Sequence, residues 1–182
     1  MRSEQRVLIL PGWQNSGPAH WQSRWEALHG FERVQQADWD RPLRGDWMVQ
    51  LEEAVLAEAR PTVLVAHSLG CQLVAAWAAH SRLAGRISGA LLVAPPDTAH
   101  ADTPPQLASW SAITRQRLPF PALVVYSSDD PFCCADRARQ MAGDWGAAAL
   151  CLGAAGHLNA DSGLGDWPEG LALLRSICTA AA

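Results

Sequence analysis

A serine, an aspartate and a histidine each follow an apolar run of the kind that forms a buried β-strand. They are Ser68, Asp130 and His157. A serine hydroxyl becomes a nucleophile when a histidine takes its proton, and a carboxylate orients that histidine and stabilises its charged form. Because the carboxyl ends of parallel strands meet at one edge of a sheet, we expect the three side chains to converge there. They predict acyl transfer through a covalent acyl-enzyme.

The surroundings of Ser68 are typical of a nucleophile elbow, a sharp turn that joins a strand to a helix and lifts the serine hydroxyl above the sheet. The sequence is Ala66-His67-Ser68-Leu69-Gly70, between an apolar run and a helix-forming run. Small residues two positions before and after the serine relieve crowding in such a turn, and both positions are small here. A serine that only caps the following helix is the alternative interpretation.

Asp130 is the candidate acid, and Asp129 competes with it because both come directly after the run 122–127. A turn residue before Pro131 is the alternative role for Asp130. His157 is the candidate base because it follows Gly156 and the run 148–152. The other histidines are expected to be poorer bases. His67 is predicted to point away from the serine, and the rest lie in expected helices or the long loop: His20, His29, His80 and His100.

Acyl transfer also needs N–H donors for the oxyanion. The backbone N–H of Leu69, at the start of a helix, is one candidate. The loop 10–17 is expected to supply the second, because Gly12 lets its backbone approach closely; the N–H of Trp13 is preferred and that of Gln14 comes next. A plain strand-to-helix turn is the alternative for this loop. The predicted substrate pocket takes residues from the same edge of the sheet: Trp13, Gln14, Trp110 and Phe132.

Strand-forming and helix-forming segments alternate along the chain and predict a three-layer α/β fold, with a mostly parallel six-stranded sheet and helices on both faces. The run 62–66 is apolar throughout, as expected of the central strand. We expect one domain over residues 1–182. The expected strands are 7–10, 33–37, 62–66, 89–94, 122–127 and 148–152. The expected helices are 18–29, 46–59 (capped by Asp46), 69–80, 135–142 and 168–179, with a short one near 107–117 in the long irregular segment 95–121.

Composition excludes several other classes of protein. The 182 residues carry a net charge of −4 and no basic run, so nucleic acid is not an expected partner. The chain contains no lysine, which excludes Schiff-base and serine–lysine mechanisms. No apolar stretch is long enough for a membrane helix or signal peptide. Five cysteines without C-x-x-C spacing favour reduced thiols and a cytoplasmic location. No metal-ligand spacing or phosphate-binding loop is present, so we expect no metal and no cofactor.

The elbow, the stretch Ser128-Asp129-Asp130-Pro131-Phe132 and the sequence Ala155-Gly156-His157 resemble the small serine hydrolases related to retinoblastoma-binding protein 9 and the bacterial YdeN-type proteins. The resemblance covers nearly the whole chain. It implies a compact α/β-hydrolase fold without a lid domain, Asp130 as the acid, and hydrolysis of carboxylic esters. The chain departs from the family pattern in its Leu10-Pro11-Gly12-Trp13 opening and in Ala66, where relatives often have glycine.

We therefore predict a serine hydrolase that cleaves a small acyl ester, thioester or amide, with Ser68 as nucleophile, His157 as base and Asp130 as acid. Without a lid, short or soluble acyl groups are favoured over long lipids. Two alternatives stay open. One is a binding or regulatory protein on a hydrolase scaffold, which a loop collapsed onto Ser68 would favour. The other is an acyltransferase or peptidase that uses the same three residues. Substrate and oligomeric state are left open.

Overall fold

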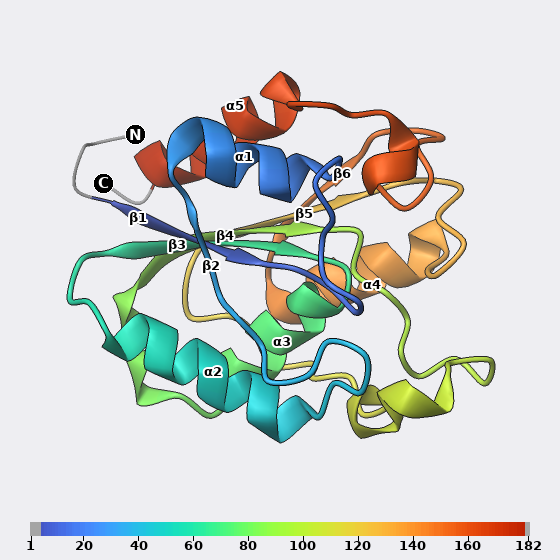
Figure 1. Cartoon of the computed structure of the whole chain (residues 1–182). Coiled ribbons are helices and arrows are strands. Elements are labelled where there is room, and N and C mark those ends of the chain that lie inside the picture. Colours follow the sequence, from blue (N-terminus) through green and yellow to red (C-terminus); the bar gives the residue numbers. More distant parts are fainter. Residues whose placement is uncertain (1–4, 181–182) are drawn as a thin grey trace.

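The computed structural model describes residues 5–180, so the first four residues and the last two of the expected 1–182 domain lie outside the described residues. Its centre is a six-stranded sheet in the order β2-β1-β3-β4-β5-β6, with all neighbouring strands parallel (Figure 1). The strands are β1 (Arg6–Leu10), β2 (Glu32–Arg33), β3 (Thr62–His67), β4 (Ile87–Val93), β5 (Ala122–Tyr126) and β6 (Ala148–Cys151). The predicted parallel α/β architecture is confirmed.

Five α-helices cover the two faces of this sheet, α1 and α5 on one side and α2, α3 and α4 on the other (Figure 1). They are α1 (Trp21–His29), α2 (Arg44–Leu56), α3 (Leu69–Ala78), α4 (Ala135–Trp145) and α5 (Pro168–Ala180). Short 3₁₀ helices occupy three connections: η1 (Arg82–Arg86), η2 (Pro105–Trp110) and η3 (Ala160–Ser162). No helix within residues 5–180 is long and apolar enough to cross a membrane.

The core lies in two layers, one on each face of the sheet. Alternate residues of the central strand β3 point to opposite faces, so Val63 and Val65 pack under α1 and α5 while Leu64 packs against α2 and α3. All six residues of β3 are buried, which explains why its sequence is a nearly continuous apolar run. Trp25 and Trp77 are buried in these layers, as the sequence analysis expects of most tryptophans.

Several predicted elements differ in extent from those observed, and three of these differences have a clear physical reason. The strand expected at 33–37 is reduced to Glu32–Arg33, because β2 is an edge strand that pairs only with the middle of β1. Helix α2 begins at Arg44 rather than at Asp46, which lies in the first turn where a carboxylate faces the positive end of the helix dipole. The helix expected near 107–117 is the shorter 3₁₀ helix η2, Pro105–Trp110.

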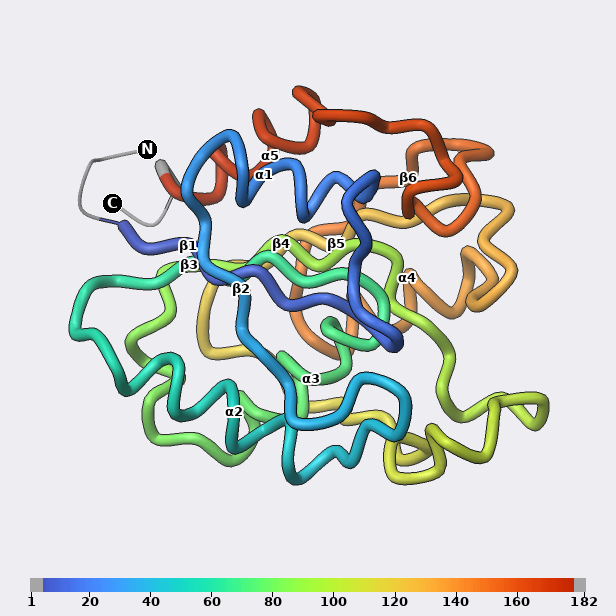
Figure 2. The backbone as a smooth tube through the Cα atoms, in the orientation of Figure 1, coloured from blue at the N-terminus to red at the C-terminus, as the bar shows by residue number. Residues whose placement is uncertain are grey.

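The long segment after β4 crosses to the start of α2 (Figure 2). Trp110 at the end of η2 donates its indole N–H to the carbonyl oxygen of Pro42 over 2.8 Å. The Arg44 guanidinium binds the carbonyl oxygen of Ala112 at 2.9 Å from the other side. These bonds hold η2 beside the carboxyl edge of the sheet, where Leu107 reaches the cavity described below.

Gly70 lets α3 lie very close to the end of β1. A Cβ atom at this position would lie 2.3 Å from the carbonyl oxygen of Leu10 and 3.0 Å from that of Pro11. Both neighbours are backbone atoms, which cannot rotate away as a side chain can. The end of β1 and the first turn of α3 are therefore held at a spacing that only glycine permits.

We expect Gly70→Ala to destabilise the fold by about 1–3 kcal/mol, because the added methyl group forces the helix and the end of β1 apart. Urea unfolding followed by circular dichroism measures the change in unfolding free energy. Gly143→Ala in α4 is the matched control, since nothing lies within 4 Å of a Cβ there. That variant should be more stable by about 0.5–1 kcal/mol. Equal behaviour of the two variants would contradict the role given to Gly70.

Candidate active site

Ser68 occupies the turn between β3 and α3 with a backbone conformation that a non-glycine residue rarely adopts. Its φ is 52° and its ψ is −124°. The backbone N–H of Ser68 donates to the carbonyl oxygen of Val93 at the end of β4, which ties the turn to the neighbouring strand over 2.9 Å. Strain of this kind persists only where the surroundings hold the turn in place. The geometry is that of the predicted elbow.

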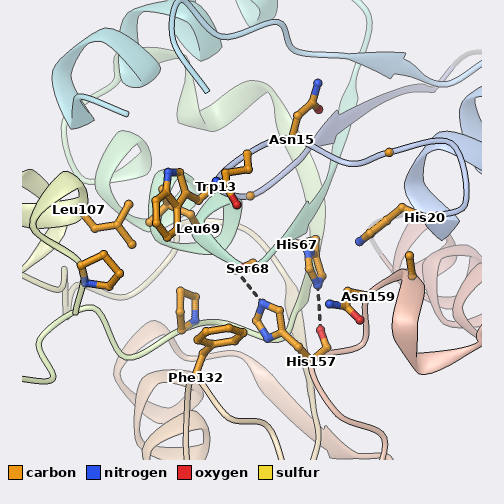
Figure 3. A pocket seen from close by; sticks show the side chains of 16 residues that line it. Trp13, Asn15, His20, His67, Ser68, Leu69, Leu107, Phe132, His157 and Asn159 are labelled. Atoms are coloured by element: carbon orange, nitrogen blue, oxygen red, sulfur yellow. Dashed lines mark hydrogen bonds between the residues drawn. The ribbon is translucent and has the colours of Figure 1, made fainter. Parts of the chain in front are cut away.

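The structure brings Ser68, His157 and Asp130 together at the carboxyl edge of the sheet. His157 Nε2 lies 2.9 Å from Ser68 Oγ (Figure 3). His157 Nδ1 lies 3.0 Å from Oδ1 and 2.9 Å from Oδ2 of Asp130. The Asp130 side chain is 2% exposed and that of His157 is 10% exposed. A neutral imidazole that donates its Nδ1 proton to this carboxylate would have Nε2 free to accept a proton from Ser68.

Asp129, the competing acid, supports the loop of His157 instead of touching its ring. Its Oδ1 accepts the hydroxyl proton of Ser127 at 2.6 Å and the backbone N–H of Gly156 at 2.8 Å. These hydrogen bonds, first of all the one from Ser127, hold the pKa of the Asp129 carboxyl below its usual value. The two neighbouring aspartates thus have different positions: Asp130 contacts the ring of the candidate base, and Asp129 contacts the backbone next to it.

His67 does not point away from the serine, so that prediction is wrong. Its Nε2 lies 2.9 Å from the carbonyl oxygen of His157 (Figure 3), and a carbonyl can only accept, so His67 donates. Burial, with the nearby rings of His157 and His20, lowers the pKa of His67 well below its usual value. The residue after His157, Leu158, has a φ of 50°, a strained value for leucine. His67 helps to hold this strained loop.

Three consecutive residues at the start of α1 contact three parts of the site. His20 is not within the helix as predicted but caps it, with Nδ1 accepting the N–H of Gln22 at 3.1 Å, and it lines the cavity beside Ser68. Trp21 donates its indole N–H to the carbonyl oxygen of Leu158 at 2.8 Å. The buried Gln22 amide donates to the carbonyl oxygen at the end of β1 at 3.2 Å. The first turn of α1 therefore joins the loop that carries His157 to the loop after β1.

The loop after β1 packs directly on the elbow. A Cβ at Gly12 would lie 2.8 Å from Ser68 Cβ and 3.2 Å from Leu69 N, so glycine permits this close approach. The backbone N–H of Gln14 donates to the carbonyl oxygen of Trp39 at 3.0 Å and is therefore not available to an oxyanion. The N–H groups of Trp13 and Leu69 make no hydrogen bond to any part of the chain that the structure describes. Of the three candidate donors named from the sequence, Trp13 and Leu69 therefore keep an N–H that an oxyanion could use.

A cavity of about 380 Å³ opens above Ser68, a volume typical of a small-molecule site. Gln14 and Phe132 line it as predicted, and so does Trp13. Trp110 does not line it, so its placement in the pocket is wrong. Its side chain is 1% exposed and packs edge-on against Trp47 below the sheet, with ring centroids 5.6 Å apart. In η2 the residue that reaches the cavity is Leu107 instead, a residue that the sequence analysis missed.

Other lining residues were also missed or misjudged: His20, His67 and Asn159. The signal that could have found two of them is position. His20 ends the loop that leaves the carboxyl end of β1, and Asn159 follows the candidate base by two residues. Both loops start at the edge of the sheet where parallel α/β folds bind ligands. Residues anywhere in those loops are pocket candidates, whatever their distance from a motif.

The thiol nearest to the elbow is not placed to act as a nucleophile. Cys71 is fully buried inside α3, and its Sγ lies 3.3 Å from the carbonyl oxygen of Val93. Burial raises the pKa of Cys71 well above its usual value, so the thiol stays protonated and unreactive. Among the residues that the structure describes, no group of three or more His, Cys, Asp and Glu side chains could hold a metal ion.

Comparison with solved structures finds proteins with the same fold as this chain. A YdeN-like hydrolase from Pectobacterium atrosepticum is 26% identical, with a TM-score of 0.86 over 98% of this chain and 92% of that one. The ydeN gene product of Bacillus subtilis is 22% identical, with a TM-score of 0.74 over 97% and 100%. An esterase from a Rhodococcus species is 12% identical, with a TM-score of 0.72 over 99% and 92%. The chain therefore has the α/β-hydrolase fold, in a small form without an evident lid.

A search of curated proteins gives no match. The comparison with protein families does: the family described as serine hydrolase matches residues 7–176, which is most of the chain and includes the elbow, both aspartates and the candidate base. The chain thus belongs to the serine hydrolase family.

Proposed function

We propose that the protein hydrolyses a small carboxylic ester, or a thioester or amide, through an acyl-enzyme on Ser68. His157 Nε2 takes the hydroxyl proton as Ser68 Oγ attacks the carbonyl carbon. Asp130 keeps the imidazole in the correct tautomer and stabilises its charged form. The N–H groups of Trp13 and Leu69 stabilise the oxyanion. His157 then protonates the leaving group, and water attacks the acyl-enzyme with the same histidine as base.

The observation that carries this proposal is the continuous contact from Asp130 through His157 to Ser68, with distances of 2.9 Å on both sides of the ring. The strained elbow supports it, because a serine that merely caps a helix needs no such backbone conformation. In addition, the Ser68 side chain makes no bond to a backbone N–H of α3, as a capping serine would.

A purely binding role is less well supported by the geometry. A loop after β1 that is collapsed onto Ser68 would favour such a protein. Gly12 and Trp13 instead line an open cavity together with Ser68 and Leu69. Acyl transfer to an acceptor other than water uses the same residues, and product analysis with competing nucleophiles separates it from hydrolysis.

We expect a fluorophosphonate probe to form a single covalent adduct on Ser68, because the probe reacts with activated serine hydroxyls. Intact-mass spectrometry measures the adduct. Ser68→Ala and His157→Ala should both remove it, since one lacks the nucleophile and the other lacks its base. A folded wild-type protein that stays unlabelled would contradict the proposed function.

Replacing the two aspartates one at a time tests which of them is the acid. Asp130→Asn should lower kcat by roughly 10⁴-fold, because an amide stabilises the wrong tautomer of the imidazole. Asp129→Asn should keep most of the activity, because its amide oxygen can still accept from Ser127 and Gly156. Ester hydrolysis with purified variants measures both. A larger loss in Asp129→Asn would reverse the assignment.

A further inference from the structure

The two sides of the cavity beside Ser68 differ in chemistry. We call the side formed by Trp13, Leu107 and Phe132 the apolar wall, and the side formed by His20 and Asn159 the polar wall (Figure 3). Ser68 and the ring of His157 lie between them (Figure 3). The acyl group and the alcohol group of an ester leave its carbonyl carbon in different directions. An ester bound at Ser68 can therefore place one group against each wall.

The polar wall offers hydrogen-bond donors, because the acceptor atom of each of its side chains is turned toward a backbone N–H of the protein. Asn159 Oδ1 accepts the backbone N–H of Asp161 at 3.0 Å, and since that partner can only donate, the orientation of the amide is settled. Its Nδ2 is left to donate. His20 Nδ1 likewise accepts the N–H of Gln22. The proton of a neutral His20 ring is therefore on Nε2.

His20 has a donor that the protein leaves unused. The residue is 5% exposed, and its Nε2 is buried without a hydrogen-bond partner. Burial, followed by the charges of Arg33 and of a protonated His157, lowers the pKa of His20 to about 4, so the ring is neutral near pH 7. A buried donor without an acceptor destabilises the protein, because it gives up its hydrogen bond to water and gains none in return. An acceptor brought by a ligand would remove that cost.

The cavity also lacks charged partners for a charged substrate. Among residues 5–180, no Asp, Glu or Arg side chain lines it. Arg33, behind the wall, is already bound to the carboxylate of Glu26 and to the hydroxyl of Ser23. A carboxylate in the cavity would lose its hydration without gaining an ion pair. Uncharged groups avoid that loss.

We propose that the substrate is an uncharged ester with unlike ends: a hydrocarbon group against the apolar wall, and opposite it a group with a neutral oxygen, as in an ether, hydroxyl or carbonyl, that accepts from Asn159 and His20. The proposal rests on the proposed function. It assigns His20 and Asn159 as residues that determine specificity.

Pairs of esters of equal length test this proposal. In the acyl arm, p-nitrophenyl pentanoate is compared with p-nitrophenyl 3-methoxypropanoate. In the alcohol arm, butyl acetate is compared with 2-methoxyethyl acetate. The p-nitrophenyl monoester of succinate supplies a carboxylate. Each kcat/KM is divided by the rate of hydrolysis by hydroxide, which removes differences in intrinsic reactivity.

In one of the two arms, we expect the normalised kcat/KM of the methoxy ester to exceed that of the hydrocarbon ester by about fivefold, which is the effect of one ordinary hydrogen bond. We expect the succinate ester to be the poorest acyl substrate. The arm in which the preference is found shows whether the acyl group or the alcohol group of the ester faces the polar wall. Equal rates within both pairs, or a preference for the succinate ester, would overturn the proposal.

Two variants remove a donor but keep the cap that the residue provides. His20→Asn keeps an acceptor for the N–H of Gln22 but does not reach the position of Nε2. Asn159→Ser keeps an acceptor for the N–H of Asp161 but has no amide nitrogen. Each should lower kcat/KM for the methoxy ester several-fold more than for the hydrocarbon ester, which removes the preference. A merely structural role predicts an equal loss with both esters, and that result would overturn the assignment.

Two controls keep this inference separate from the proposed function. His29→Asn changes an exposed histidine at the far end of α1, outside the cavity lining, and should keep the preference. Fluorophosphonate labelling is run on every variant. A wild-type protein without label contradicts the proposed function itself, whereas labelling of Ser68 together with equal rates for each ester pair contradicts only the assignment of the polar wall.

Discussion

Two consecutive residues at the end of β3 hold the same histidine at two points. Ser68 contacts the ring of His157 at Nε2, and His67 donates to its backbone carbonyl, both over 2.9 Å. Because the two residues are covalent neighbours, the distance between candidate nucleophile and base depends on one short piece of backbone. The rest of the site is arranged around this piece. The end of β1 packs against it through Gly12 and Gly70, and β4 holds it through the N–H of Ser68.

The charged carboxylate of Asp130 lies on one side of His157, and two neutral histidine rings lie on the other. Asp130 contacts His157 from a position where its side chain is nearly inaccessible to solvent. The rings of His67 and His20 lie in sequence beyond the base, with successive centroids 4.9 Å and 4.6 Å apart. Burial is the largest cause that lowers the pKa of both His67 and His20, and repulsion from nearby positive charges adds to it. In the proposed mechanism, the positive charge that forms on His157 during proton transfer would therefore be balanced by the carboxylate of Asp130.

The parts of the site that sequence could predict are those fixed by the ends of strands. Ser68, Asp130 and His157 each follow an apolar run, and parallel strands bring such positions to one edge whatever the details of packing. The choice between Asp129 and Asp130 is different, because neighbouring residues at the end of a strand point in different directions. There the resemblance to a family implied Asp130, and the carboxylate geometry agrees.

Side-chain direction in loops could not be predicted in the same way. Trp110 was expected at the cavity because its segment is irregular. The 3₁₀ helix η2 instead points its side chain into the core, where the indole N–H donates to the carbonyl oxygen of Pro42. His67 was expected to point away from the serine, but the loop that carries His157 comes back over its side chain. The length of β2 was overestimated because periodicity does not show how much of an edge strand has a partner.

The first turn of α1 has a consequence for how the protein loses activity. Its residues bind the base loop through Trp21, the end of β1 through Gln22, and the cavity through His20. Helix α1 has only nine residues, and short elements on a sheet often open in sub-global steps below the free energy of complete unfolding. One such opening would release the loop that carries His157 and the loop after β1 in the same event. Inactivation would then precede the loss of the sheet, and amide exchange in α1 would follow activity more closely than exchange in β3.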